Sequence, residues 1–382
     1  MVKWVATVMS LFWVLFLCHA LAFPFEPFPS EVEVVPSANG SDHAPRHLAK
    51  RASRYPRVKY GSTCSVTQQE YLETELDEIQ TMMTRVTGQL QIMRAVIREK
   101  EQPATWDTRF KENSRILGSW AAMMGRIRFN HEFELEDKTP NLVPWRTTSQ
   151  NMQFTMSVYN RIRNVLRDRT LSVTIHCDDT FYVFDKDAST TDARIYRDTR
   201  STETPLFTKL TRSGRLCHEG GGGNGWQMWN KVTLEDEICI CPRVFDRAKS
   251  SQTLSSLENT MDSLRGRDID DIKTFTAAGS LLHELSHCQS ILGDDATEDL
   301  SSHLGPPYPD IVIPGYQRKG VWTLSKADPR QAHRNADSLT FFALALYYSA
   351  CDWSKGICGA ELLPFGFWSK KMHRYMEMDY DT

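Results

Sequence analysis

The sequence contains one stretch with a strong chemical pattern, Thr276-Ala277-Ala278-Gly279-Ser280-Leu281-Leu282-His283-Glu284-Leu285-Ser286-His287-Cys288. Histidines four residues apart lie on one face of a helix, about one turn apart, so the imidazoles of His283 and His287 can bind a single Zn²⁺. Glu284 then lies beside the metal, where its carboxylate can take a proton from a zinc-bound water. The pattern predicts a zinc site with two histidine ligands and Glu284 as the general base.

The surrounding residues favour the helix that this pattern needs. Leu281, Leu282 and Leu285 form an apolar face, and no proline interrupts residues 268–291. Three acidic residues stand where negative charge favours the start of a helix: Asp268, Asp270 and Asp271. The alternative is an ordinary amphipathic helix that carries two histidines on its polar side.

The composition is that of a globular protein. The chain has 382 residues, of which 41% are hydrophobic and 24% are charged, and its formal net charge is −3. Such a chain lacks the excess of basic residues that binds phosphate backbones, so we expect no nucleic-acid partner.

The first 22 residues have the pattern of a secretory signal peptide. Lys3 precedes an apolar run from Trp4 to Leu17, and Ala20-Leu21-Ala22 is a small-residue cleavage site. A membrane anchor is the alternative, but the run is shorter than the roughly 20 residues that span a bilayer. We therefore predict a signal peptide over residues 1–22, a secreted, extracellular protein, and no membrane partner.

Residues 23–51 are rich in proline, small and acidic residues and show no helical or strand period. The segment ends in Lys50-Arg51, a dibasic pair of the kind that processing proteases of the secretory pathway cut. We predict a pro-segment over residues 23–51, whose removal would leave residues 52–382 as a single domain. A charged linker with a coincidental Lys-Arg pair is the alternative.

The cysteines agree with secretion. Apart from one cysteine in the signal peptide, the chain has eight, an even set in a protein bound for an oxidising compartment. We expect four disulfides, with Cys351 and Cys358 closing a local loop in the C-terminal tail. Cys239 and Cys241 should have different partners, and a disulfide at Cys288 should anchor the helix of the two histidines.

Hydrophobic periodicity predicts a mostly helical chain with a few strands. Ser65 to Gln68 matches a capping box, and an apolar stripe of helical spacing runs from Tyr71 to Val96. The other predicted elements are helices over Thr108–Met124, Ser149–Leu166 and Leu339–Tyr348, and strands over Leu171–His176, Thr180–Phe184 and Ile238–Ile240.

Five features follow one another along the chain. They are the capped helix near Cys64, Ile175-His176-Cys177-Asp178, Cys239-Ile240-Cys241-Pro242, His283 to His287, and Asn335-Ala336-Asp337-Ser338 before an apolar helix. Together they resemble the fungal aspzincin metallopeptidases, which include deuterolysins and peptidyl-lysine metalloendopeptidases. The resemblance spans roughly residues 62–350. It implies an α+β, zincin-like fold, mostly helical with a small β-sheet and disulfide-bonded, with zinc in a groove between two parts.

The resemblance also implies an aspartate as the third zinc ligand, in a Gly-Thr-x-Asp-x-x-Tyr-Gly motif whose tyrosine assists the transition state. This chain has no Gly-Thr pair after the histidines. We favour Asp310, because Tyr316 and Gly320 follow it much as the tyrosine and glycine follow in the family, and Tyr316 could then stabilise the oxyanion. The other candidate ligands are Asp294, Asp295 and Asp299. Each aspartate could instead be a turn residue, and Tyr316 a surface aromatic.

Asp337 has two interpretations. As structure, the segment from Asn335 to Ser338 caps the final helix, which is apolar nearly all round and therefore buried. As function, the resemblance implies that Asp337 lines the substrate pocket, where its carboxylate would pair with a lysine ammonium of the substrate.

These observations predict a secreted zinc metalloendopeptidase, a hydrolase of protein or peptide substrates. We expect a monomer with one Zn²⁺ per chain, bound by His283, His287 and Asp310. The alternative is a secreted binding or effector protein that keeps the fold and has lost turnover. A zinc amidase acting on non-protein amides would need the same activated water, so the sequence does not separate it from a peptidase.

Overall fold

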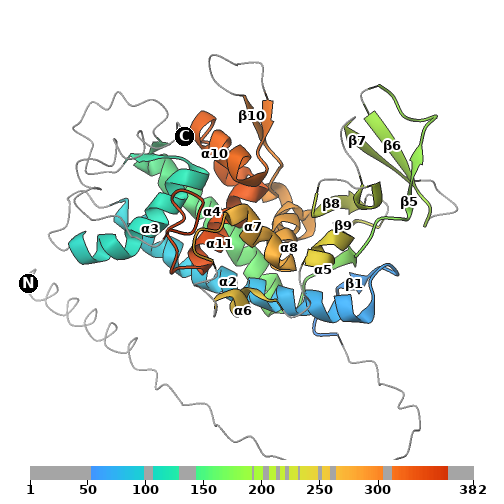
Figure 1. The fold of residues 1–382 in the computed structure, drawn as a ribbon, viewed down its shortest axis with the longest axis horizontal. Helices are drawn as coiled ribbons and strands as arrows, with labels where there is room; N and C mark the ends of the chain where they lie inside the picture. The colour runs from blue at the N-terminus through green and yellow to red at the C-terminus, as the bar shows by residue number, and fades with distance from the viewer. Residues whose placement is uncertain are drawn as a thin grey trace, which may run out of the picture. The chain divides into compact units, whose positions relative to one another are not determined.

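The computed structural model describes residues 53–98, 106–128, 143–191, 193–200, 206–211, 216–219, 223–230, 233–247, 252–258, 264–303 and 312–359. The expected signal peptide and pro-segment lie outside the described residues, and so does Asp310. The described chain combines helices with small sheets, as the sequence predicts (Figure 1). In the ranges that the structure describes, no helix is long and apolar enough to cross a bilayer.

The helices and strands follow one another in a mixed order. The helices are α2 (Val66–Val96), α3 (Trp106–Met124), α4 (Trp145–Arg167), α5 (Pro242–Arg247), α6 (Leu254–Glu258), α7 (Ile269–Phe275), α8 (Ala277–His287), α9 (Gln289–Leu292), α10 (Gln317–Ala327) and α11 (Ala336–Tyr347). The strands are β1 (Lys59–Tyr60), β2 (Ile127–Arg128), β3 (Val143–Pro144), β4 (Val173–His176), β5 (Tyr182–Asp185), β6 (Ala193–Asp198), β7 (Leu206–Thr211), β8 (Gly225–Asn230), β9 (Glu235–Ile240), β10 (Ser301–His303) and β11 (Val312–Pro314).

The long helix α2 confirms the first helix predicted from the sequence. The Ser65 side chain accepts a hydrogen bond from the Gln68 backbone N–H at 3.3 Å, and the Gln68 side chain accepts one from the Ser65 N–H at 2.9 Å. This is the expected capping box. The apolar stripe of α2 packs on α4, α8 and α11.

Helix α11 is buried along its whole length, as its apolar sequence predicts. It contacts α2, α3, α7 and α8. Helix α8, which carries the two histidines, packs against both α2 and α11 and is therefore fixed in the core. A helix held in this way presents its polar side chains with little freedom to move.

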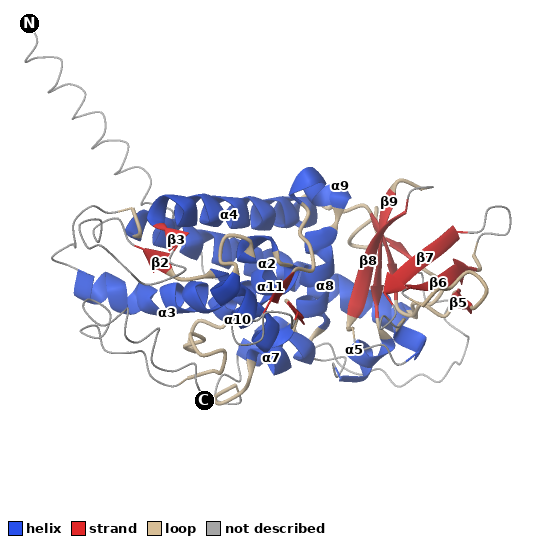
Figure 2. Cartoon of the chain, turned by 90° about the horizontal axis from the view of Figure 1, so that it is seen from above, coloured by secondary structure: helices blue, strands red, loops and turns tan. Residues whose placement is uncertain are grey.

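The main sheet has the strand order β1-β4-β9-β8. Strands β1, β4 and β9 are parallel, and β8 pairs antiparallel with β9, with Gly225 opposite Ile240. Strand β8 is the edge strand, and both β8 and β9 contact α8 (Figure 2). A separate antiparallel sheet contains β5, β6 and β7.

The run from Asp268 to His287 is interrupted where the sequence pattern predicts a continuous helix. Thr276 has an extended backbone conformation, and its hydroxyl accepts a hydrogen bond from the Ala278 N–H at 3.3 Å. Glu75 of α2 accepts from the same N–H at 2.9 Å. Because both groups act as helix caps, α7 ends and α8 begins at this point, and the acidic residues Asp270 and Asp271 start α7 instead of the motif helix.

Among the described residues, the eight cysteines form three disulfides, so the expectation of four is wrong. They are Cys64–Cys177, Cys217–Cys241 and Cys351–Cys358. The local loop in the tail is therefore confirmed. Disulfide pairs of this kind are typical of extracellular proteins.

Cys239 and Cys288 are free and buried, so the predicted disulfide anchor at Cys288 is wrong. The Cys239 sulfur lies 3.8 Å from that of Cys217, which is already bonded to Cys241. The Cys288 sulfur contacts the Glu284 carbonyl oxygen of its own helix at 3.5 Å. Cys288 packs as a small apolar side chain in the core, a role that an even cysteine count cannot reveal.

Candidate metal centre

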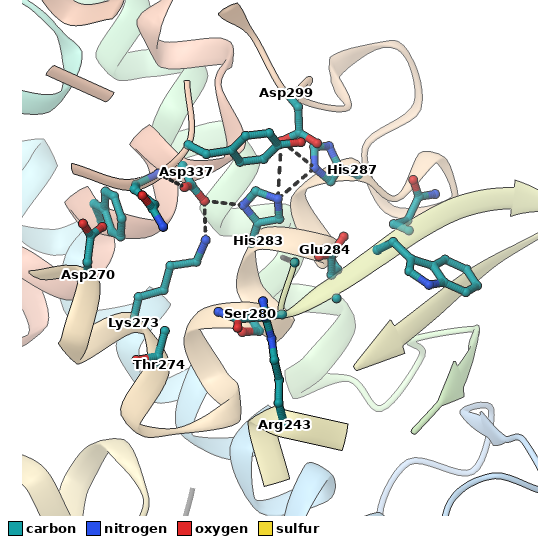
Figure 3. Close-up of a pocket in the computed structure, with 18 of the residues that line it drawn as sticks. Arg243, Asp270, Lys273, Thr274, Ser280, His283, Glu284, His287, Asp299 and Asp337 are labelled. Carbon is teal, nitrogen blue, oxygen red and sulfur yellow. Dashed lines mark hydrogen bonds and ion pairs between the residues drawn. The ribbon is translucent and has the colours of Figure 1, made fainter. Parts of the chain in front are cut away.

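The two histidines line a pocket of about 880 Å³. Its walls come from α7, α8, β8 and the beginnings of α10 and α11 (Figure 3). The motif helix thus meets the edge strand of the sheet on one side and the helical core on the other. The site predicted from the motif is therefore a pocket, open to a ligand.

Three side-chain atoms meet at the centre of this pocket. The Nε2 atoms of His283 and His287 are 3.3 Å apart. Each of them lies 3.4 Å from the Oδ1 atom of Asp299. The three atoms form a nearly equilateral triangle, and Figure 3 shows the carboxylate of Asp299 above both imidazole rings.

This triangle has the size that a zinc ion requires. Ligands at about 2.0–2.1 Å from a tetrahedral zinc are separated from one another by about 3.3–3.4 Å, from the geometry of the tetrahedron. Two imidazole nitrogens and one carboxylate oxygen are also a donor set that catalytic zinc sites use, with a fourth position left for water or substrate. The residues present therefore fit a catalytic zinc ion.

Hydrogen bonds fix the loop that carries Asp299. Thr297 donates its backbone N–H to the Ser286 carbonyl of α8 at 2.8 Å, and the two side-chain hydroxyls are 2.7 Å apart. On the other side of Asp299, Leu300 donates its N–H to the Asn335 side chain at 3.1 Å. The loop is held to α8 before the aspartate and to the start of α11 after it.

The outer nitrogens of the histidines also have partners. His287 Nδ1 lies 2.8 Å from the Thr297 carbonyl oxygen, so this nitrogen carries a proton and Nε2 is free for a metal. His283 Nδ1 lies 2.6 Å from Oδ1 of Asp337. Carboxylate and carbonyl partners of this kind orient metal-binding histidines and make them better ligands.

The carboxylates around the two histidines make this site electrostatically suited to a cation. Burial and Lys273 lower the pKa of His283, but the carboxylates of Asp337, Glu284 and Asp299 outweigh them and raise it to about 9. Burial raises the pKa of Asp299, yet its contacts with the two histidines hold this pKa well below the usual range. Protonation of the histidines therefore competes with metal binding.

Zinc binding is expected to weaken as the pH falls. His283 binds a metal only after losing its proton, and its pKa is raised to about 9. Below about pH 9, competition by this one proton should therefore raise the apparent dissociation constant for zinc by about tenfold per pH unit. Competition with a chelator of known zinc affinity, at pH 6, 7 and 8, measures this constant. A constant that stays unchanged between pH 6 and 8 would contradict the expectation.

Glu284 lies in the pocket, on the side of α8 that faces the sheet. It is buried, and burial raises the pKa of its carboxyl group above the ordinary value. Strand β8 passes close by: a Cβ at Gly225 would lie 3.1 Å from Glu284 Oε1 and 2.6 Å from the Cys239 carbonyl oxygen. A glycine at this position therefore lets the edge strand approach the carboxylate.

Tyr316 lines the same pocket, directly before α10. Its ring centre lies 6.2 Å from that of His283. Tyr316 is 45% exposed, as a surface aromatic would be, yet partial burial of its hydroxyl and the nearby Asp299 carboxylate raise its pKa above the ordinary value, so the phenol keeps its proton. A protonated hydroxyl at this place can donate a hydrogen bond to a bound carbonyl group.

Among the aspartates considered from the sequence, the structure brings Asp299 to the histidines. Asp310, the favoured candidate, lies outside the described residues. Asp295 pairs with Arg161 of α4 at 2.8 Å, and Asp294 is exposed in a 3-10 turn, Gly293–Asp295. Neither of these two aspartates is among the residues that line the pocket.

The segment from Asn335 to Ser338 does more than cap a helix. Asn335 is the N-cap residue of α11, but its side chain makes no capping hydrogen bond. Instead it accepts from the Leu300 N–H and donates to the Gly315 carbonyl oxygen at 2.9 Å. The helix thus starts at this segment, as expected, while the Asn335 amide joins two loops of the site.

Asp337 lines the pocket, and its carboxylate is fully engaged within the chain. Besides the contact with His283, it accepts a hydrogen bond from the Gln317 N–H at 2.8 Å and pairs with the ammonium group of Lys273. Lys273 has no place in the sequence motif, and sequence reasoning missed it. The one feature of the sequence that could have pointed to Lys273 as a site residue is its position one helical turn before Thr276, where the motif helix begins.

No protein family model matches this chain, and no curated protein sequence matches it. Among solved structures, a zinc peptidase from Grifola frondosa is similar to it, with a TM-score of 0.34 and 14% sequence identity over 74% of this chain and 96% of that one. At this level of similarity, the function must be argued from the site itself.

Proposed function

We propose that this chain is a secreted zinc-dependent metalloendopeptidase. The observation that carries the proposal is the triangle of His283, His287 and Asp299, whose sides match those of a tetrahedral zinc site. Asp299 takes the place for which Asp310 was favoured from the sequence. An intact set of three ligands favours an enzyme over a binding protein that has lost turnover.

The remaining groups suit the hydrolysis of a peptide bond. A bound Zn²⁺ would supply an activated water and polarise the carbonyl group of the scissile bond. Glu284 takes up the proton of the attacking water and passes it to the nitrogen of the leaving amine, and its raised pKa suits both steps. Tyr316 donates a hydrogen bond to the oxyanion.

The pocket wall also suits an extended peptide. Strand β8 is the edge of its sheet and lines the pocket through Gly225, Trp226 and Gln227. An extended substrate can pair with the free backbone groups of an edge strand, which places a peptide bond across the site. This arrangement favours an endopeptidase acting on protein or peptide chains.

Metal analysis combined with proteolysis tests the proposal. The secreted protein is expected to contain about one zinc per chain and to cleave casein. A strong chelator should abolish cleavage, and added zinc should restore it. Protein with neither zinc nor cleavage would overturn the proposal, whereas one zinc per chain without cleavage of casein or a peptide library would favour a binding protein.

A further inference from the structure

The wall of the pocket opposite the sheet contains a buried ion pair. The ammonium group of Lys273 reaches from α7 to Oδ1 of Asp337, at the start of α11 (Figure 3). The side chains of Lys273 and Asp337 are 13% and 2% exposed. The Lys273 ammonium also lies 5.6 Å from the ring centre of Phe341, another residue of this wall.

The fold places Lys273 here through a close approach of two helices. Gly279 of α8 lies against the last turn of α7, and a Cβ at Gly279 would be 2.5 Å from the Lys273 carbonyl oxygen and 3.0 Å from its Cγ. Only a glycine allows this contact without movement of α7. The break at Thr276 and this glycine together bring the lysine to the metal pocket.

Without Lys273, Asp337 would be a buried carboxylate facing the pocket with too little positive charge around it. Its other contacts are the backbone N–H of Gln317 and the imidazole of His283, which the metal needs in its neutral form. An uncompensated buried charge is strongly unfavourable, so such a carboxylate would draw in a cation that fits the space. Asp270 lines the same wall and would add to this attraction.

We propose that Lys273 occupies the position that a basic side chain of the substrate would otherwise take, and so excludes lysine and arginine from this part of the pocket. The substrate residue that enters here is therefore one without a long basic side chain. This assignment makes Lys273 a specificity-determining residue, and it rests on the proposed peptidase function.

Ligand binding to the full-length chain tests the inference without any turnover. Lys273→Ala vacates the space of a butylammonium group, so n-butylammonium chloride should raise the melting temperature of this variant by about 2–4 °C at ten times its dissociation constant, relative to equal sodium chloride. The wild type and Lys273→Met, in which the space stays filled, should not respond. The exposed Lys319→Ala is the matched control and should behave as the wild type.

The preference for glutamine over lysine peptides in cleavage is the second measurement. Its first part uses the wild type alone. In an equimolar mixture of peptides with lysine or glutamine beside the scissile bond, the wild type should favour glutamine by at least about tenfold, a difference typical of one charged contact. Lys273→Ala should shift this ratio by about tenfold or more toward lysine, and Lys319→Ala should leave it unchanged.

The two readouts separate this inference from the peptidase proposal. If the wild type cleaves no peptide, the peptidase proposal fails. The change in melting temperature of Lys273→Ala with butylammonium still tests whether Lys273 fills the space beside Asp337. Equal stabilisation of the wild type and Lys273→Ala by butylammonium would overturn the inference. So would a wild type that cleaves lysine peptides as fast as glutamine peptides.

Discussion

Glu284→Gln is expected to lower peptide hydrolysis by about 10²–10⁴-fold and to leave zinc binding intact. The amide has nearly the shape of the carboxylate but cannot accept the proton of the attacking water. Because the proposed metal ligands are His283, His287 and Asp299, the variant keeps every atom of the triangle. Casein hydrolysis and zinc content, measured on the same preparation, separate the two effects.

The matched control for this variant is Glu70→Gln, an identical change at an exposed position of α2. It should leave both hydrolysis and zinc content unchanged. Glu284 is buried, and replacing a buried carboxylate by a neutral amide removes a charge from the protein interior. The substitution should therefore not lower the melting temperature. A Glu284→Gln protein that retains wild-type hydrolysis would remove Glu284 from the mechanism, and one that loses zinc would assign it a structural role.

The two histidines could be recognised from the sequence because their relation is local. Their separation and the period of the helix fix which face they share, and the packing of α8 against α2 and α11 preserves that face. The same is true of the capping box of α2 and of the buried α11, where a short stretch of sequence contains all the relevant contacts. These elements were predicted correctly.

The proposed third ligand could not be chosen from the sequence because its position depends on distant contacts. Asp299 reaches the histidines only because Thr297 binds Ser286 on one side and Leu300 binds Asn335 on the other. No periodicity connects an aspartate in such a loop to the helix before it, so several aspartates looked equivalent. The partnership of Lys273 with Asp337 spans 64 residues and was invisible for the same reason.

The cysteines show the same limit in another form. An even number suggested full pairing, but a disulfide needs two side chains at the right distance and angle, which the backbone decides. Cys239 lies next to a bonded cysteine, and Cys288 points into the apolar core. The number of cysteines suggested disulfides, and only the fold could determine the pairs.

Asp299→Asn is expected to weaken zinc binding by more than about 100-fold. Loss of a residue that only supports a metal ligand typically costs 10–100-fold in affinity, so replacing the carboxylate that itself completes the triangle should cost more. Hydrolysis should fall in parallel and recover only partly in excess zinc, because the amide oxygen is a weaker ligand and carries no charge. Titration against a competing chelator measures the affinity.

Asp295→Asn and Asp310→Asn are the comparisons that give this result its meaning. Asp295 pairs with Arg161 on a partly exposed surface, and a pair of this kind contributes about 0–1 kcal/mol, so its loss should leave zinc affinity unchanged. If Asp310→Asn lost zinc while Asp299→Asn kept it, the ligand favoured from the sequence would be the true one. Loss of zinc in Asp299→Asn alone would instead show that the hydrogen bonds of Thr297 and Leu300, rather than the spacing of a sequence motif, select the third ligand.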